Sequence, residues 1–147
     1  MDKKGTKIAI FFLGLVIAAF FIGYRMWNKP HANVADAKAE VVDAVSFYKL
    51  FSQDSATAKM QYQEKVVEVT GTVHGQAVNQ QEQQVITLET ALPGAYINCT
   101  MEVKMEKADS GSAVTLKGIC SGIGQGDADM GIPGDVYLNR CYPVNKP

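Results

Sequence analysis

The chain has 147 residues, of which 47% are apolar, and its 14 Lys and Arg against 15 Asp and Glu give a net charge of −1. This length suits one compact domain with a tail and argues against a multidomain protein. Three cysteines and two histidines, with no Cys-x-x-Cys spacing, argue against a zinc site.

An uncharged apolar run occupies Ile8–Tyr24, and Met26 and Trp27 lengthen it. A helix of this length reaches the lower limit for crossing a bilayer, and Tyr24 and Trp27 suit its interface. The sequence therefore predicts a transmembrane anchor over residues 8–27. No cysteine follows directly as a lipid acceptor.

The basic residues around this run bias its orientation. Three lysines lie in residues 1–7 and only Arg25 and Lys29 follow the run, so the positive-inside rule favours a cytoplasmic N-terminus and a globular part on the periplasmic side. A cleaved signal peptide is the open alternative, because Ala35–Ala37 has the small-residue spacing that a peptidase could use.

Asn28–Glu40 is polar and Ala-rich, which predicts a partly helical linker over residues 28–42. Residues 1–29 hold five of the 14 basic residues and one of the 15 acidic ones, so the rest of the chain has nine against 14, a net charge of −5. An acidic domain is a poor partner for phosphate backbones, and we expect no strong nucleic-acid binding.

A domain is predicted over 43–147, beginning with a helix. Asp43 is a plausible N-cap, and apolar residues then recur at helical spacing. Such a stripe is typical of a packing surface rather than a ligand site. Its members are Phe47, Leu50, Phe51, Ala58 and Tyr62.

Alternation replaces the helical period after Glu64. The segment KVVEVTGTV places Val67, Val69, Gly71 and Val73 on one face of a strand, and Gly71 suits a sharp bend. The polar stretch His74–Gln84 is expected to end this strand, and VITLE to form the second strand after a long loop.

Three more strands follow. AYINCTMEV begins after a Leu-Pro-Gly turn, and AVTLKGIC and DVYLNRCY are separated by the glycine-dense SGIGQGDADMGIPG. Closing the five strands into a small barrel would remove their exposed edges.

The segments FYKLFSQDSATAKMQYQEKVVEVTGTV, INCTMEV, VTLKGICSG and DVYLNRC together resemble the tRNA-anti-like OB-fold family of bacterial exported proteins. The resemblance covers about Asp43–Cys141. It implies a mainly β fold, a five-stranded OB-fold Greek-key barrel preceded by one α-helix, here with an N-terminal transmembrane helix. For function it implies little, because OB-folds serve many functions.

OB-folds generally bind ligands on the face of their second and third strands, between two flanking loops. Here the predicted face offers Thr87, Tyr96, Asn98 and Thr100, and the predicted rims are 76–83 and 122–135. Tyr96 could stack on a base or a sugar ring. The alternative is that all four are ordinary solvent-facing residues.

Two other groups of residues are candidates, one for a metal site and one for a disulfide. Asp127, Asp129 and Asp135 could offer oxygens to Ca²⁺, but the EF-hand spacing is absent and a flexible acidic loop is the favoured interpretation, so no metal site and no cofactor are assigned. In an oxidising compartment we expect a Cys120–Cys141 disulfide and a free, buried Cys99.

These patterns predict a binding module rather than an enzyme, because the sequence holds no Gly-Lys-Ser/Thr phosphate loop and no Gly-x-Ser-x-Gly elbow. The expected partners are the membrane, through the N-terminal helix, and an unidentified protein or small polar ligand. The alternative is single-stranded nucleic acid or an oligosaccharide bound at the predicted face.

Overall fold

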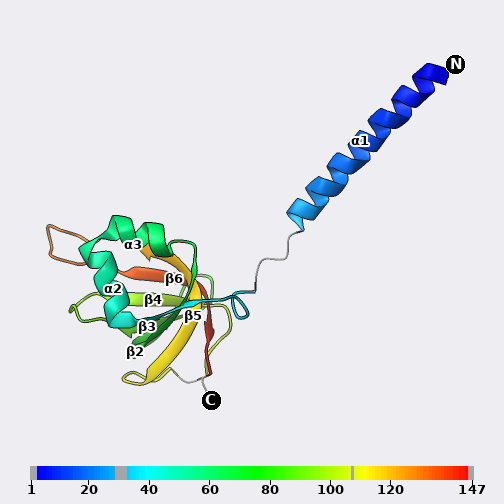
Figure 1. Cartoon of the computed structure of the whole chain (residues 1–147). Helices are drawn as coiled ribbons and strands as arrows, with labels where there is room; N and C mark the ends of the chain where they lie inside the picture. Colours follow the sequence, from blue (N-terminus) through cyan, green and yellow to red (C-terminus); the bar gives the residue numbers. More distant parts are fainter. Residues whose placement is uncertain (1–2, 29–32, 107, 146–147) are drawn as a thin grey trace. The chain divides into compact units, whose positions relative to one another are not determined.

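The computed structural model describes residues 3–28, 33–106 and 108–145. It divides the chain into two compact units, Met1–Asn33 and Val34–Pro147, which are described separately (Figure 1).

The first unit is built on one helix, α1 (Lys3–Trp27). Within it, Ile10–Trp27 is long and apolar enough to cross a membrane, and none of this stretch is buried against protein. This agrees with the predicted helix over residues 8–27. By length and composition it is a candidate membrane span, and a signal sequence would have the same character.

The described residues of the second unit form two helices and six strands. In chain order they are β1 (Glu40–Asp43), α2 (Ala44–Gln53), α3 (Ser55–Tyr62), β2 (Val66–Val78), β3 (Gln84–Glu89), β4 (Tyr96–Met101), β5 (Ala113–Ile123) and β6 (Val136–Pro143). The sheet order is β1-β2-β3-β4-β6-β5, and a further β2–β5 pairing closes it. The predicted fold class, mainly β with a closed five-stranded barrel, is therefore confirmed.

Closure depends on the long strand β2, which changes partner along its length. Residues Val66–Thr72 pair antiparallel with β5, and Val73–Val78 pair antiparallel with β3. At the other side of the barrel, β4 and β6 run parallel. One curved strand thus belongs to both halves of the barrel, as strand twist and a bulge permit.

Gly71 lies where β2 changes partner, and it also allows a helix to come close. A Cβ at Gly71 would stand 2.7 Å from the Cβ of Ala44, the first residue of α2. Atoms at that separation overlap, so only glycine fits without a shift. The glycine at position 71 therefore has a second reason besides the predicted bend, which is the close approach of α2.

The strand does not end at His74, as the polar composition predicted. His74 lies in a bulge between Val73 and Gly75, and β2 then continues to Val78. The connection to β3 is short, because the Asn79 side chain accepts hydrogen bonds from the backbone N–H groups of Gln81 and Gln83. The predicted long loop is wrong, since a bulge lets polar residues remain in a strand.

The predicted single helix is two helices that meet at Asp54. The Asp54 N–H bonds to the carbonyl of Leu50, ending α2, while its carboxylate accepts from the Thr57 N–H and begins α3. Asp43 caps α2 by accepting from the Ser46 N–H, as predicted.

The aromatic stripe is confirmed with one correction. Phe47, Phe51 and Tyr62 are buried and their rings meet edge to face, with the Phe47 centroid 5.2 Å from each of the other two. Leu50 is 44% exposed, because it lies about 100° around the helix from Phe51, and Tyr48 is buried instead. The two helices lie against the barrel, α2 over β2–β4 and α3 over β5 (Figure 1).

The end of the predicted linker is structured. Glu40–Asp43 form β1, which pairs parallel with Val67–Thr70, and Val34 is buried. Residues 29–32 of the predicted linker lie outside the described residues. Composition indicated only a polar segment here, and the strand forms because an edge of β2 is available for pairing.

Candidate ligand-binding face

The four predicted site residues lie on one outward face of β3 and β4. The register places Thr87 opposite Asn98 and Val85 opposite Thr100, with Glu89 opposite Tyr96. Alternate residues of β3 and β4 point inward and are buried, including Leu88 and Ile97. The predicted assignment of faces is therefore confirmed, whereas the binding role of these residues stays a prediction.

Two of the four side chains are engaged in a hydrogen-bond chain. The Thr87 hydroxyl donates to Asn98 Oδ1 at 3.0 Å, and Asn98 Nδ2 donates to an oxygen of Asp135 at 2.8 Å. The other Asp135 oxygen accepts from the Tyr96 backbone N–H at 2.9 Å. Thr87 and Asn98 therefore shape the face, and Asp135 ties the glycine-rich loop to β4.

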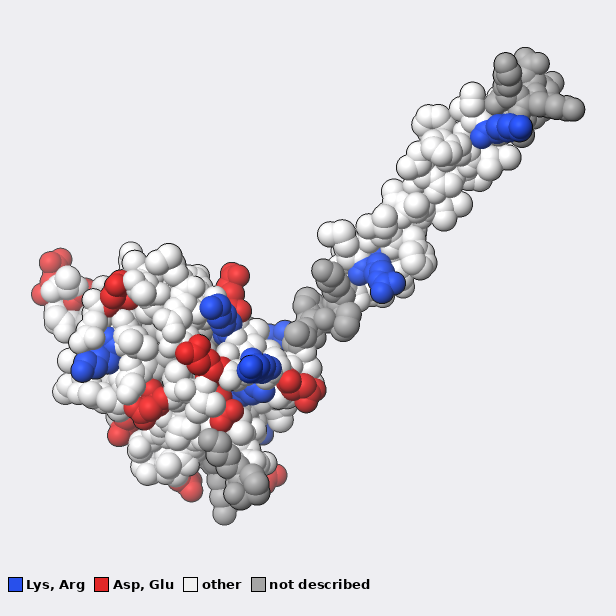
Figure 2. Space-filling model, in the orientation of Figure 1, with Lys and Arg blue, Asp and Glu red and all other residues white. Residues whose placement is uncertain are grey.

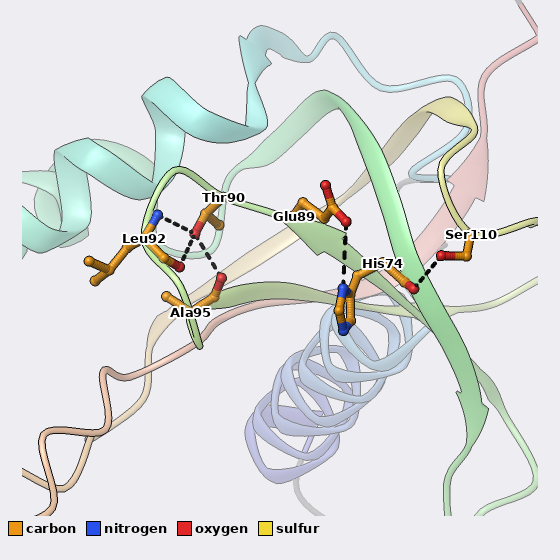
Figure 3. A network of polar contacts seen from close by, with 6 residues as sticks. All are labelled: His74, Glu89, Thr90, Leu92, Ala95 and Ser110. Carbon is orange, nitrogen blue, oxygen red and sulfur yellow. Dashed lines mark hydrogen bonds and ion pairs between the residues drawn. The ribbon is translucent and has the colours of Figure 1, made fainter.

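An aromatic–carboxylate cluster stands beside this chain and consists of His74, Glu89 and Tyr96. The His74 and Tyr96 ring centroids are 4.5 Å apart, with the rings tilted by 33°. His74 Nδ1 lies 3.6 Å from Glu89 Oε1, and these two side chains are 51% and 50% exposed (Figure 3). The cluster thus presents ring surface and a carboxylate to solvent.

Sequence reasoning found Tyr96 but missed its two neighbours. Glu89 could have been found, because it follows Thr87 by two residues in an alternating strand. His74 could not, because the bulge that turns it toward Tyr96 depends on pairing with β3.

The strand connections around the cluster are tied by hydroxyl groups. Ser110 Oγ donates to the His74 carbonyl at 2.9 Å, and Thr90 Oγ1 donates to the Ala95 carbonyl at 2.7 Å (Figure 3). Thr90 Oγ1 also accepts from the Leu92 N–H, across the β3–β4 turn. These bonds hold the backbone that carries His74, Glu89 and Tyr96.

The predicted rim at 122–135 is a tightly folded loop. Asp127 pairs with Ile132, and the Asp127 carboxylate accepts from the N–H groups of Asp129 and Met130. Tyr48 donates to the Gly134 carbonyl at 2.8 Å, and burial together with the Asp135 charge raises the pKa of Tyr48, so its hydroxyl keeps its proton. Among the described residues, no three His, Cys, Asp or Glu side chains are grouped as metal ligands.

The three cysteines are free thiols and all are buried. Interaction with the Cys99 thiol, together with burial, raises the pKa of Cys141 well above its usual range. Burial also raises the pKa of Cys120. Neither thiol is therefore prepared to act as a nucleophile. The predicted Cys120–Cys141 bond stays a prediction, but the neighbour of Cys141 is Cys99.

Charged side chains are mixed on the surface. On the face in view, Lys and Arg lie interspersed with Asp and Glu rather than as a continuous basic patch (Figure 2). The strand segments Val66–Val78, Gln84–Glu89 and Tyr96–Met101 contain no Lys or Arg at all. Binding of a polyanion normally needs such residues along its path.

Two solved structures are similar to this chain at low sequence identity. A candidate nucleic acid-binding lipoprotein from Klebsiella pneumoniae is 18% identical, with a TM-score of 0.48, over 80% of this chain and 100% of that one. A candidate aspartyl-tRNA synthetase from Leishmania major is 11% identical, with a TM-score of 0.43, over 81% of this chain and 23% of that one. No curated protein matches.

A family model connects the fold to the sequence resemblance. The tRNA_anti-like model matches residues 3–130, which include the helices, the first four barrel strands and most of the glycine-rich loop. With well over half of its residues matched, the chain belongs to the tRNA_anti-like family.

Proposed function

We propose that this protein is a membrane-tethered binding module, not an enzyme, that takes a protein or small polar ligand on the outward face of β3 and β4. The observation that carries the proposal is the aromatic–carboxylate cluster, in which His74 and Glu89 are half-exposed and Tyr96 is partly buried beside His74. Binding sites commonly combine ring surface with a few fixed polar groups.

The charge of the face favours a neutral or cationic group as the ligand. Glu89 is half-exposed, Asp135 lies at the adjacent loop, and the strands of this face hold no Lys or Arg. The net charge of residues 30–147 is −5. A basic side chain of a protein partner could pair with Glu89 and lie against the Tyr96 ring.

Helix α1 supports ligand binding close to a membrane, on its periplasmic side. Side chains around α1 are exposed to solvent, including Phe20 and Leu15, and a bilayer would cover this apolar surface. The lysines before the span favour a cytoplasmic N-terminus, which places the barrel outside.

Site-specific photo-crosslinking in intact cells tests this proposal. A photoreactive residue at Tyr96 should give a defined crosslinked product, and the same residue at Met60 on α3 is the control because Met60 is 79% exposed. Glu89→Gln should reduce the Tyr96 product. Equal products from both positions, or none from Tyr96, would contradict a ligand at this face.

An oligosaccharide is the second candidate, and the paired rings of His74 and Tyr96 favour it. A sugar ring can stack on an aromatic face while a carboxylate such as Glu89 accepts from its hydroxyl groups. A glycan array with wild type and Tyr96→Ala tests this candidate. Gel shifts with single-stranded oligonucleotides provide the comparison, and we expect weak binding that modest salt abolishes.

A further inference from the structure

We propose that the tip of the glycine-rich loop, residues 125–132, is a protein-docking element. It inserts Met130 and Ile132 into an apolar cleft of a partner protein, and Lys or Arg side chains border that cleft. The loop tip lies outside strands β3 and β4, so this contact does not rest on the function proposed for their outward face.

The loop tip exposes apolar side chains that the barrel does not use. Every residue from Gln125 to Ile132 is exposed, with Met130 at 74% and Ile132 at 51%. Neither side chain belongs to the hydrophobic core. Single exposed apolar residues are ordinary on a protein surface, but two of them at the end of one loop favour a contact surface.

The loop tip is held in one conformation by its own backbone. Asp127 and Ile132 exchange two N–H···O bonds of 2.8 Å each. The Asp127 carboxylate also accepts from the N–H groups of Asp129 and Met130, at 3.0 and 3.1 Å. The backbone that carries the two apolar side chains is therefore organised before a partner arrives, which lowers the entropy cost of binding.

Glycines let the two arms of the loop come together. A Cβ at Gly126 would overlap the carbonyl oxygen of Ile132, and a Cβ at Gly134 would overlap that of Gly124. At the base of the loop, the Tyr48 hydroxyl of α2 donates to the Gly134 carbonyl at 2.8 Å. Figure 1 shows the connection between β5 and β6 extending outward from the barrel. The loop therefore presents its tip on a narrow, braced stalk.

The charge of the loop selects the kind of partner. Residues 124–135 contain three Asp and no Lys or Arg. Asp135 is bonded to β4, whereas Asp127 and Asp129 are exposed and form no ion pair with the described residues. Two carboxylates beside two apolar side chains fit an apolar cleft with a basic rim, because opposite charges across an interface align the partners.

The same charges disfavour two other occupants. A second copy of this chain would bring together two units that each carry a net charge of −5 over residues 30–147. The anionic lipid headgroups of a bilayer would repel Asp127 and Asp129. A cleft on a different, basic protein is therefore the occupant that the loop tip fits, and the flexible side chain of Met130 can adapt to its shape.

Photo-crosslinking of the full chain in intact cells tests the proposal. A photoreactive residue at Met130 should give one defined protein product, whose crosslinked segment, mapped by mass spectrometry, is apolar with Lys or Arg alongside. Gln81, which is exposed on the β2–β3 turn, is the control position. A lipid product, a product with a second copy, a contact segment without these features, equal products from both positions, or no product would overturn the proposal.

Charge variants separate docking from chance contact. Asp129→Lys should lower the yield of the Met130 product about tenfold, because like charges would then face each other. Glu82→Lys makes the same charge change at an exposed position of the β2–β3 turn and should leave the yield unchanged. Equal yields from these two variants would contradict docking on a basic rim.

Binding of the captured protein to the full chain in detergent measures the apolar contact. Ile132→Ala should raise the dissociation constant about tenfold, as expected for truncation of an anchor in a cleft. Val78→Ala is the matched control, because Val78 is 69% exposed on β2. Circular dichroism checks that both variants are folded. An equal dissociation constant for both variants and wild type would overturn the proposal.

Glu89→Gln separates this proposal from the function proposed for the β3–β4 face. This variant should leave the Met130 product unchanged. Loss of the Tyr96 product with the Met130 product retained would support the loop tip as a contact of its own. Loss of the Met130 product in folded Glu89→Gln protein would show that the loop tip does not dock independently and would overturn the proposal.

Discussion

The two units of this chain use apolar side chains in opposite ways. In α1, Phe20 is 78% exposed and Trp27 is 93% exposed, whereas in the barrel unit Phe47 is fully buried. The residue types are the same, and their spacing differs. Apolar residues are continuous in α1, recur every three or four positions in α2, and alternate in the strands.

This contrast shows that each unit needs a different environment for its apolar surface. The barrel unit buries its alternating residues within itself, so it forms a compact unit without help. The apolar surface of α1 has no such partner among the described residues, and a bilayer would supply one.

Removal of residues 1–29 should have the largest effect. The shortened protein should move completely from the membrane fraction to the soluble fraction and stay folded, because the barrel core lies within Val34–Pro147. Cell fractionation measures where the shortened protein is found, and circular dichroism measures whether it is folded. Full-length protein in the soluble fraction would contradict an anchor, and a mature N-terminus near Lys38 would favour a cleaved signal peptide.

Within the barrel unit, Phe47→Ala should lower the free energy of unfolding by about 3–5 kcal/mol, because a fully buried ring contact is replaced by a cavity. Leu50→Ala in the same helix is the control. Its side chain is partly exposed, and the loss should stay below about 1 kcal/mol. Urea denaturation measures both values, and equal losses would contradict the observed helix orientation.

Gly71→Ala should cost about 1–3 kcal/mol, since its methyl group would overlap Ala44 at the start of α2. Gly75→Ala, in the same strand, is the matched control, because nothing lies within 4 Å of the added atom. Thermal unfolding of the two variants should differ clearly. Equal destabilisation would point to backbone freedom, rather than the helix contact, as the reason for glycine.

The smallest effect concerns the cap between the two helices. Hydrogen bonds from the Thr57 side chain and backbone lower the pKa of Asp54. The cap's stabilising contribution is therefore present above the ordinary Asp pKa of about 3.9 and is lost as the pH falls through the lower folded value. NMR titration should show the Asp54 pKa rising in Thr57→Val, and an unchanged pKa would contradict the assignment.

The sequence predicted most of the barrel because alternation reports directly which side of a strand is buried, as in Val67, Val69 and Val73. It could not predict the break at Asp54, since this one residue ends α2 through its backbone N–H and begins α3 through its carboxylate. It also missed the bulge at His74, and with it the ring contact to Tyr96, because both depend on pairing between distant segments.

The parallel pairing of β4 with β6 also bears on how the barrel forms in time. β2 has to find β5 across a long stretch of chain, as the Thr70–Thr115 pairing shows, and β4 stays an open edge until β6 arrives. Folds dominated by such distant pairings typically fold in milliseconds to seconds. A chain that emerges segment by segment would therefore expose unpaired strands until β6 is available, and until then it would be open both to chaperones and to aggregation.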